Sequence, residues 1–106
     1  MNQNRIELLK SEIIQNPNDP FYPYALALEY KDSAADKCLK QLEEVLLKFP
    51  DYLPIFYQLG ELYADFEMYE ESKKIYQRGI ELAEKKKDLK TLSELKNAYQ
   101  NILYED

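Results

Sequence analysis

The sequence predicts an all-α protein, and three observations carry that prediction. Residues that favour helix, chiefly Leu, Glu, Lys, Ala and Gln, are abundant. Only two glycines and five prolines are present, which is too little turn chemistry for a sheet of many strands. The apolar residues recur with the period of an amphipathic helix, about 3.6 residues. Six helical segments account for almost the whole chain.

The first three helices are expected at residues 3–15, 21–31 and 33–48. The first ends before Pro17 and the third before Pro50, because a residue that precedes proline disfavours helical backbone. The second is entered through Pro20, and its Pro23 falls in the first turn, where a missing amide hydrogen costs little. The apolar stripes of these helices are Ile6, Leu9 and Ile13; Leu26 and Tyr30; and Cys38, Leu42, Val45 and Leu46.

The last three helices are expected at residues 52–64, 68–86 and 89–104. The fourth helix follows Asp51, a residue suited to an N-cap, and holds Pro54 in its first turn. The sixth helix starts after Asp88. Their apolar stripes are Phe56, Leu59 and Tyr63; Ser72, Ile75, Tyr76, Gly79 and Ala83; and Leu92, Leu95, Tyr99 and Ile102.

The pattern of the second and third helices recurs in the fourth and fifth. Matching residues stand 33 positions apart in the first helix of each pair and at the adjoining prolines: Leu26 and Leu59, Ala27 and Gly60, Tyr30 and Tyr63, Pro17 and Pro50. In the second helix of each pair the spacing is 34: Cys38 and Ser72, Leu42 and Tyr76, Val45 and Gly79. A turn that is one residue shorter in the first copy explains the difference. The chain therefore repeats a helix–turn–helix unit.

This unit resembles the tetratricopeptide repeat. The family pattern places a large apolar residue, Leu-Gly or Leu-Ala, and Tyr in the first helix, then small, aromatic and small residues in the second, and a closing Pro. The second copy matches it at Phe56, Leu59, Gly60, Tyr63, Ser72, Tyr76 and Gly79. Its closing position is Glu84, which lets the fifth helix run longer. The first copy is weaker, since Pro23 replaces the large residue and Val45 a small one.

The resemblance implies a short right-handed α-solenoid of antiparallel helix hairpins. Residues 1–106 are expected to form one domain, with a cap helix at 1–17, repeats at 18–50 and 51–87, and a cap helix at 88–106. Lys96 stands where the family has Gly or Ala, so the last helix is expected to show a polar outer face. Gly60 and Gly79 are expected to leave space for the large side chains of Tyr63 and Tyr76. The core is also expected to contain the Cys38 thiol and the rings of Tyr30, Tyr63, Tyr76 and Tyr99.

The charge of the chain argues against a nucleic acid or an anionic membrane as the main partner. The net charge is −6, with nine acidic and six basic residues in 1–53 and eleven and eight in 54–106. Neither half is basic, as binding to phosphates would require. The one basic cluster, Lys85 to Lys87 with Lys90, is interpreted as a solvated helix end, where cations meet the negative end of the helix dipole.

The residue inventory offers no catalytic or metal-binding set. There is no histidine, one cysteine and no glycine-rich loop, so a general base, a zinc site and a phosphate-binding loop are not expected. We therefore predict no enzyme activity, no cofactor and no metal. The lone Cys38 favours a reducing compartment, and neither a signal peptide nor an apolar stretch of membrane-spanning length is recognisable. A cytoplasmic location is expected.

Partner-binding residues are predicted on the face that lines the inner, concave groove in the family. Tyr24 and Tyr57 follow the large apolar position of their repeats, and stacked first helices would place them side by side. On the last helix the same face is expected to carry Ser93, Asn97, Gln100 and Asn101. The candidate binding residues are Tyr24, Leu28, Lys31, Tyr57, Glu61, Asp65 and Asn97. The first-helix tyrosines suit an interface because they combine large area with a hydroxyl group.

The leading hypothesis is a module that binds a protein or peptide segment in this groove. One alternative is that the two tyrosines only shield the helix stack or contact the last helix. Another is a self-associating, homodimeric module that uses Phe21, Tyr22, Tyr52, Phe66 and Tyr104. The lysine and asparagine clamp with which some family members hold chaperone C-termini is missing, so that ligand is not predicted.

Overall fold

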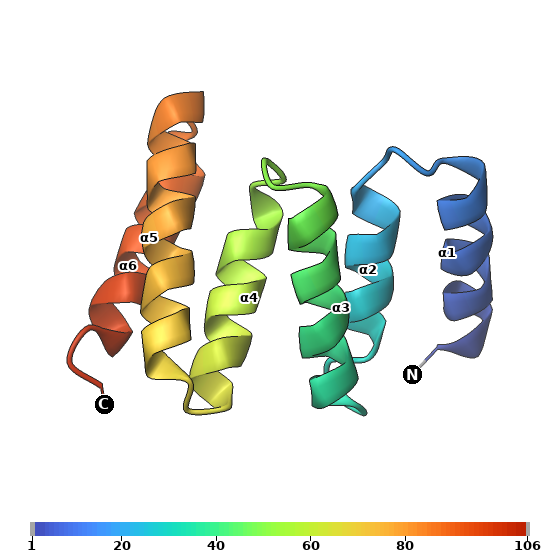
Figure 1. Ribbon diagram of the computed structural model, residues 1–106, viewed down its shortest axis with the longest axis horizontal. Helices are drawn as coiled ribbons and strands as arrows, with labels where there is room; N and C mark the ends of the chain where they lie inside the picture. Colours follow the sequence, from blue (N-terminus) through green and yellow to red (C-terminus); the bar gives the residue numbers. More distant parts are fainter. Residues whose placement is uncertain (1, 106) are drawn as a thin grey trace. The chain divides into compact units, whose positions relative to one another are not determined.

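The structure is a computed structural model that describes residues 2–105, and within them it contains six α-helices and no strand (Figure 1). The helices are α1 (Gln3–Gln15), α2 (Phe21–Glu29), α3 (Ala35–Lys48), α4 (Pro54–Asp65), α5 (Tyr69–Lys86) and α6 (Leu89–Ile102). The predicted all-α fold is confirmed. The chain divides into two compact units, unit 1 (Met1–Tyr52) and unit 2 (Leu53–Asp106). The division into two repeats and two cap helices within one domain stays a prediction.

The ends of the helices lie close to those expected, with one error of capping. Pro54 occupies the first turn of α4 as predicted, but the N-cap is Leu53 and no side chain caps the helix. The N-cap prediction for Asp51 is therefore wrong, because proline at the start of the helix places Asp51 too far upstream to reach its amides. Asp88 does cap α6, and its Oδ1 accepts a hydrogen bond from the Thr91 amide at 3.1 Å.

Unit 2 is built from α4, α5 and α6, each of which packs against the other two. The buried side chains come mainly from one face of each helix, and Ile55, Phe56, Leu59, Tyr76 and Leu95 are among the most deeply buried. Ser72 is fully buried in this interface, and its hydroxyl donates a 2.7 Å hydrogen bond to the carbonyl of Gly60. This bond ties α5 to the backbone of α4.

Both glycines stand where two helices of unit 2 approach closely. A Cβ at Gly60 would lie 2.4 Å from Cε1 of Tyr76, and a Cβ at Gly79 would lie 2.6 Å from the Cβ of Phe56. The small positions are thus confirmed, and so is Tyr76 as the residue opposite Gly60. Tyr63 is buried in the core as expected, but it is not the residue nearest either glycine, because the space at Gly79 is taken by Phe56 together with Leu95.

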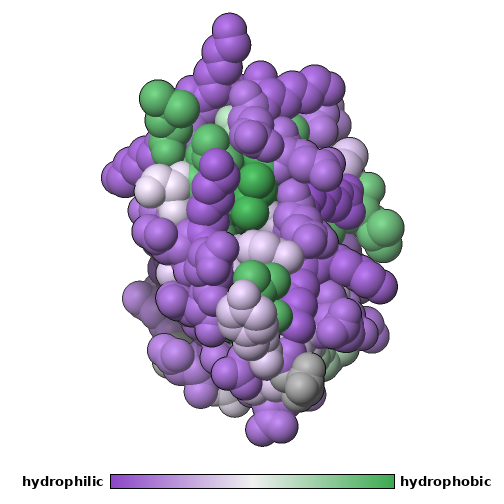
Figure 2. Space-filling view, turned by 90° about the vertical axis from the view of Figure 1, so that its left-hand side faces the viewer, coloured by the Kyte–Doolittle hydropathy of each residue, from purple (hydrophilic) through white to green (hydrophobic). Residues whose placement is uncertain are grey.

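The side of unit 2 on which α5 and α6 lie is mainly hydrophilic, with apolar atoms exposed between the polar ones (Figure 2). Lys96 is exposed on α6, and Lys85 and Lys86 lie in the last turn of α5, where the helix dipole favours cations. Tyr99 was predicted to be buried, but it is only half-buried, and its hydroxyl accepts a hydrogen bond from Gln77 Nε2 at 2.9 Å.

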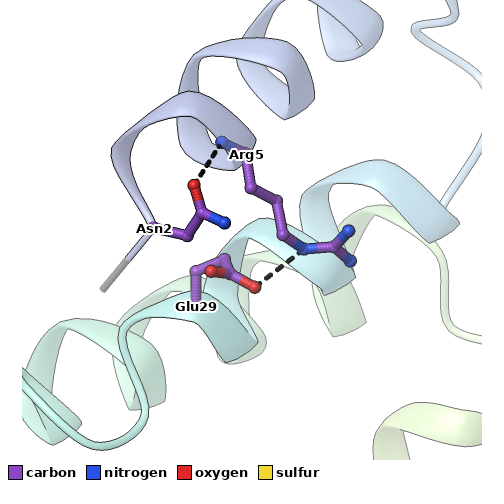
Figure 3. Close-up of polar contacts among 3 residues, drawn as sticks. All are labelled: Asn2, Arg5 and Glu29. Carbon is purple, nitrogen blue, oxygen red and sulfur yellow. Dashed lines mark hydrogen bonds and ion pairs between the residues drawn. The ribbon is translucent and has the colours of Figure 1, made fainter.

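Unit 1 consists of α1, α2 and α3, with α2 in contact with both of its neighbours. At the start of α1, Asn2 Oδ1 accepts a hydrogen bond from the Arg5 amide at 3.0 Å (Figure 3). The Nε of Arg5 in turn donates to Glu29 Oε2 at 2.8 Å and so links α1 to the end of α2 (Figure 3). At the other end, Lys48 Nζ donates to the Pro17 carbonyl at 3.2 Å.

The core of unit 1 contains the apolar stripes expected for its helices except Ile13, which is only half-buried. Its most buried members are Ile6, Ala27, Cys38 and Leu42. The thiol of Cys38 is packed as predicted, and burial raises its pKa, with the nearby charge of Lys31 acting in the opposite direction. Such a thiol is a packing group rather than a reactive one.

Candidate functional site

A groove of about 660 Å³ lies in unit 2 and is lined mainly by side chains of α4 and α6. We refer to it as the unit 2 groove. Its α4 wall includes Tyr57, Glu61 and Asp65, which succeed one another every four residues and therefore share one face of the helix. Its α6 wall includes the polar residues Thr91, Glu94, Asn97 and Asn101.

The tyrosine opposite Gly60 contributes to the lining of the groove from the third helix of the unit. Tyr76 comes from α5, and it reaches the groove because Gly60 has no side chain to block its ring. Burial raises the pKa of the Tyr76 hydroxyl, and the charges of Glu61 and Asp65 and the hydroxyl of Tyr57 raise it further. The phenol is therefore neutral at physiological pH and can donate or accept a hydrogen bond.

Four of the seven predicted binding residues line this one groove: Tyr57, Glu61, Asp65 and Asn97. The Tyr57 side chain is 38% exposed, the largest aromatic surface available to a ligand there. On α6 the predicted face was partly wrong, since Asn97 and Asn101 line the groove but Ser93 and Gln100 do not. Sequence reasoning missed Glu94, although counting one helical turn back from Asn97 would have found it.

The other three predicted residues, Tyr24, Leu28 and Lys31, belong to unit 1 and are each half-buried. The ring of Tyr24 packs edge-to-face against that of Tyr52, with centroids 5.3 Å apart. Lys31 was expected on a helix but lies in the turn after α2, where its amide donates to the Leu28 carbonyl at 3.1 Å. The pairing with Tyr52, which no repeat pattern predicts, holds Tyr24 in place.

Unit 1 also contains a smaller cavity of about 280 Å³ between the end of α1, α2 and α3. It is lined by Ile13, Pro17, Leu26, Val45 and Phe49 among others, and by none of the predicted binding residues. Within residues 2–105 no group of three or more His, Cys, Asp or Glu side chains could hold a metal ion. None of the helices there has the length and apolar character needed to cross a membrane.

Comparison with known proteins identifies the architecture. No protein-family model and no curated protein matches the chain. A solution NMR structure of a tetratricopeptide repeat domain protein from Salinibacter ruber is 38% identical and superposes with a TM-score of 0.76, over 82% of this chain and 89% of that one. The chain belongs to the tetratricopeptide repeat family. A crystal structure of such a protein from the same organism gives 36% identity and a TM-score of 0.77, over 83% and 100% of the chains.

Membership of the tetratricopeptide repeat family explains why the unit 2 groove lies where it does. The α4–α5 hairpin matches the family pattern most closely, and its small residue Gly60 brings Tyr76 to the groove. Tetratricopeptide repeat domains are in general interaction modules rather than catalysts.

Proposed function

We propose that this chain is a protein-interaction module without catalytic activity, and that the unit 2 groove binds a segment of a protein partner. The observation that carries the proposal is the gathering of Tyr57, Glu61, Asp65 and Asn97 along one groove. A partly exposed aromatic ring beside polar side chains is typical of protein-binding surfaces. Tetratricopeptide repeat domains bind proteins or peptides, which supports the same assignment.

Unit 1 contributes its own surface to the proposal through Tyr24, Leu28 and Lys31. Tyr24 is held by its contact with Tyr52, so little conformational entropy is lost when a ligand packs on it. A cytoplasmic, reducing setting belongs to the proposal as well, since Cys38 is a free thiol.

The proposal is tested by selecting phage-displayed random dodecapeptides on the immobilised chain. Selected peptides are then measured against Tyr57→Ala and against Tyr104→Ala, a matched control because Tyr104 is 89% exposed and does not line the groove. We expect Tyr57→Ala to weaken binding about tenfold or more, as interface tyrosines commonly do. Peptides that bind both variants as well as the wild type, or no selected peptides, would contradict the proposal.

Self-association is the second candidate, because large apolar side chains are exposed on both units. Phe21, Phe66 and Tyr104, which were predicted to form a homodimer contact, are 46%, 41% and 89% exposed. Leu89 adds to them at 76%. Light scattering decides the matter: a molar mass near 12.6 kDa at every concentration would exclude the dimer.

A further inference from the structure

The unit 2 groove is lined by three carboxylates and by no basic side chain. Glu61 and Asp65 from α4 and Glu94 from α6 line it, and none of its lining residues is Lys or Arg. Among residues 2–105, neither Asp65 nor Glu94 takes part in an ion pair. The other polar side chains of the lining are neutral amides and hydroxyls. The charge of this surface is therefore carboxylate only.

None of the basic residues of unit 2 lines the groove, and several have positions or contacts elsewhere. Lys85 and Lys86 lie in the last turn of α5. Lys73 donates to the Glu105 carbonyl at 2.7 Å, and the Arg78 guanidinium lies 5.6 Å from the centre of the Phe56 ring. These four are half of the eight bases of residues 54–106, and none of the eight lines the groove.

The partly exposed ring of Tyr57 adds a second feature suited to cations. A guanidinium or ammonium group is attracted to the face of a tyrosine ring, and a guanidinium also forms paired hydrogen bonds with a carboxylate. Both contacts strengthen where water is displaced. Tyr76, which also lines the groove, has a hydroxyl pKa raised by burial first and then by Glu61, Tyr57 and Asp65, the direction expected beside carboxylates.

From this charge complementarity we propose that the unit 2 groove selects a partner segment that carries arginine or lysine side chains beside an apolar residue. The inference rests on the proposed function and adds the chemistry of the ligand. The carboxylates of Asp65 and Glu94 pair with the basic side chains, and Leu53, Ala98 and Ile102 offer apolar contact. The twelve residues of α4 span about 18 Å, which matches five or six residues of an extended segment.

The test uses an array of synthetic hexapeptides, each with a central leucine or phenylalanine and two flanking positions set to Arg, Lys, Gln or Glu. The array is probed with the wild-type chain, with Asp65→Asn/Glu94→Gln, and with Glu81→Gln/Glu84→Gln. The last variant is the matched control, because it removes the same two charges from exposed positions of α5 outside the groove. A Tyr57→Ala variant reports on the groove itself.

We expect the wild type to prefer the basic peptides over their Gln counterparts by roughly tenfold, with the preference falling as NaCl rises from about 50 to 200 mM. The groove variant should lose most of this preference and the α5 variant should keep it. Retention that depends on Tyr57 but not on peptide charge would overturn this inference and leave the proposed function standing. An equal loss in both charge variants would assign the preference to the net charge of the chain and also overturn it. No retention of any peptide would overturn both.

Discussion

Replacement of Gly60 by alanine tests the packing that brings Tyr76 to the groove. The added Cβ would lie 2.4, 2.6 and 2.7 Å from Cε1, Cζ and Cδ1 of Tyr76. Carbon atoms in favourable contact are about 3.5–4.0 Å apart, so the ring has to move by roughly 1 Å. Tyr76 is only 3% exposed and is enclosed by its neighbours, which makes such a shift costly.

Two opposing effects set the size of the change in stability. Alanine favours helix over glycine by about 1 kcal/mol. Overpacking of a filled core costs about 1–3 kcal/mol, and separation of α4 from α5 would also lengthen the 2.7 Å hydrogen bond from Ser72 to the Gly60 carbonyl. We therefore expect Gly60→Ala to lower the free energy of unfolding by about 1–2 kcal/mol.

The first repeat indicates which second substitution would compensate for Gly60→Ala. At the positions of Gly60 and Tyr76 it has Ala27 and Leu42, both fully buried. Tyr76→Leu alone leaves a cavity and should cost about 2–4 kcal/mol, but in that background the Gly60→Ala methyl finds space. The free energy of unfolding of the double variant should exceed the value expected from adding the two single effects by at least about 1 kcal/mol. Urea unfolding followed by circular dichroism at 222 nm measures it. Additive effects, or a Gly60→Ala variant more stable than the wild type, would refute the reasoning.

Three further predictions follow from the same contacts. Tyr57→Ala should change the free energy of unfolding by less than about 0.5 kcal/mol, because the Tyr57 ring is partly exposed. Tyr24→Ala should lower it by about 1 kcal/mol, because the ring contact with Tyr52 is lost. Urea unfolding measures both changes. Cys38 is fully buried and burial raises its pKa, so at pH 8 a thiol reagent should label it on the order of a hundredfold more slowly in the native chain than in urea. Burial also raises the pKa of Tyr76 above its usual 10.0. The neutral phenol therefore contributes stability that is complete below about pH 10 and is lost as the pH rises further. In urea unfolding between about pH 9 and 12, the Tyr76→Phe variant should lose less stability than the wild type.

Most of the fold could be predicted because repeat spacing and helix period agree in this chain. The repeat pattern alone was enough to predict the small residue at Gly60 and the large residue at Tyr76. The N-cap at Asp51 was wrongly predicted because Pro54 was placed at the third position of the helix, whereas the helix begins at Pro54 itself. Helix starts depend on local backbone geometry that propensity alone does not determine.

The site was less accessible to sequence reasoning, since a groove is formed by helices that are distant in sequence. The α4 wall followed from the four-residue spacing of Tyr57 and Glu61, but the rotation of α6 about its axis did not, and so Glu94 was missed. The ring contact between Tyr24 and Tyr52 was missed for a similar reason, because Tyr52 lies in a turn outside the repeat pattern. Periodicity indicates which face of a helix is apolar, while neighbouring helices decide which polar residues meet.

The central claim is that the unit 2 groove binds a basic protein segment, and chemical-shift mapping tests it most directly. The ¹⁵N-labelled chain is titrated with the tightest-binding arginine-containing hexapeptide from the array. We expect the largest shifts on the backbone amides of Tyr57 and Asp65 and on the side-chain amides of Asn97 and Asn101. Shifts concentrated around Glu81 and Glu84 on α5, with the groove amides unchanged, would contradict it.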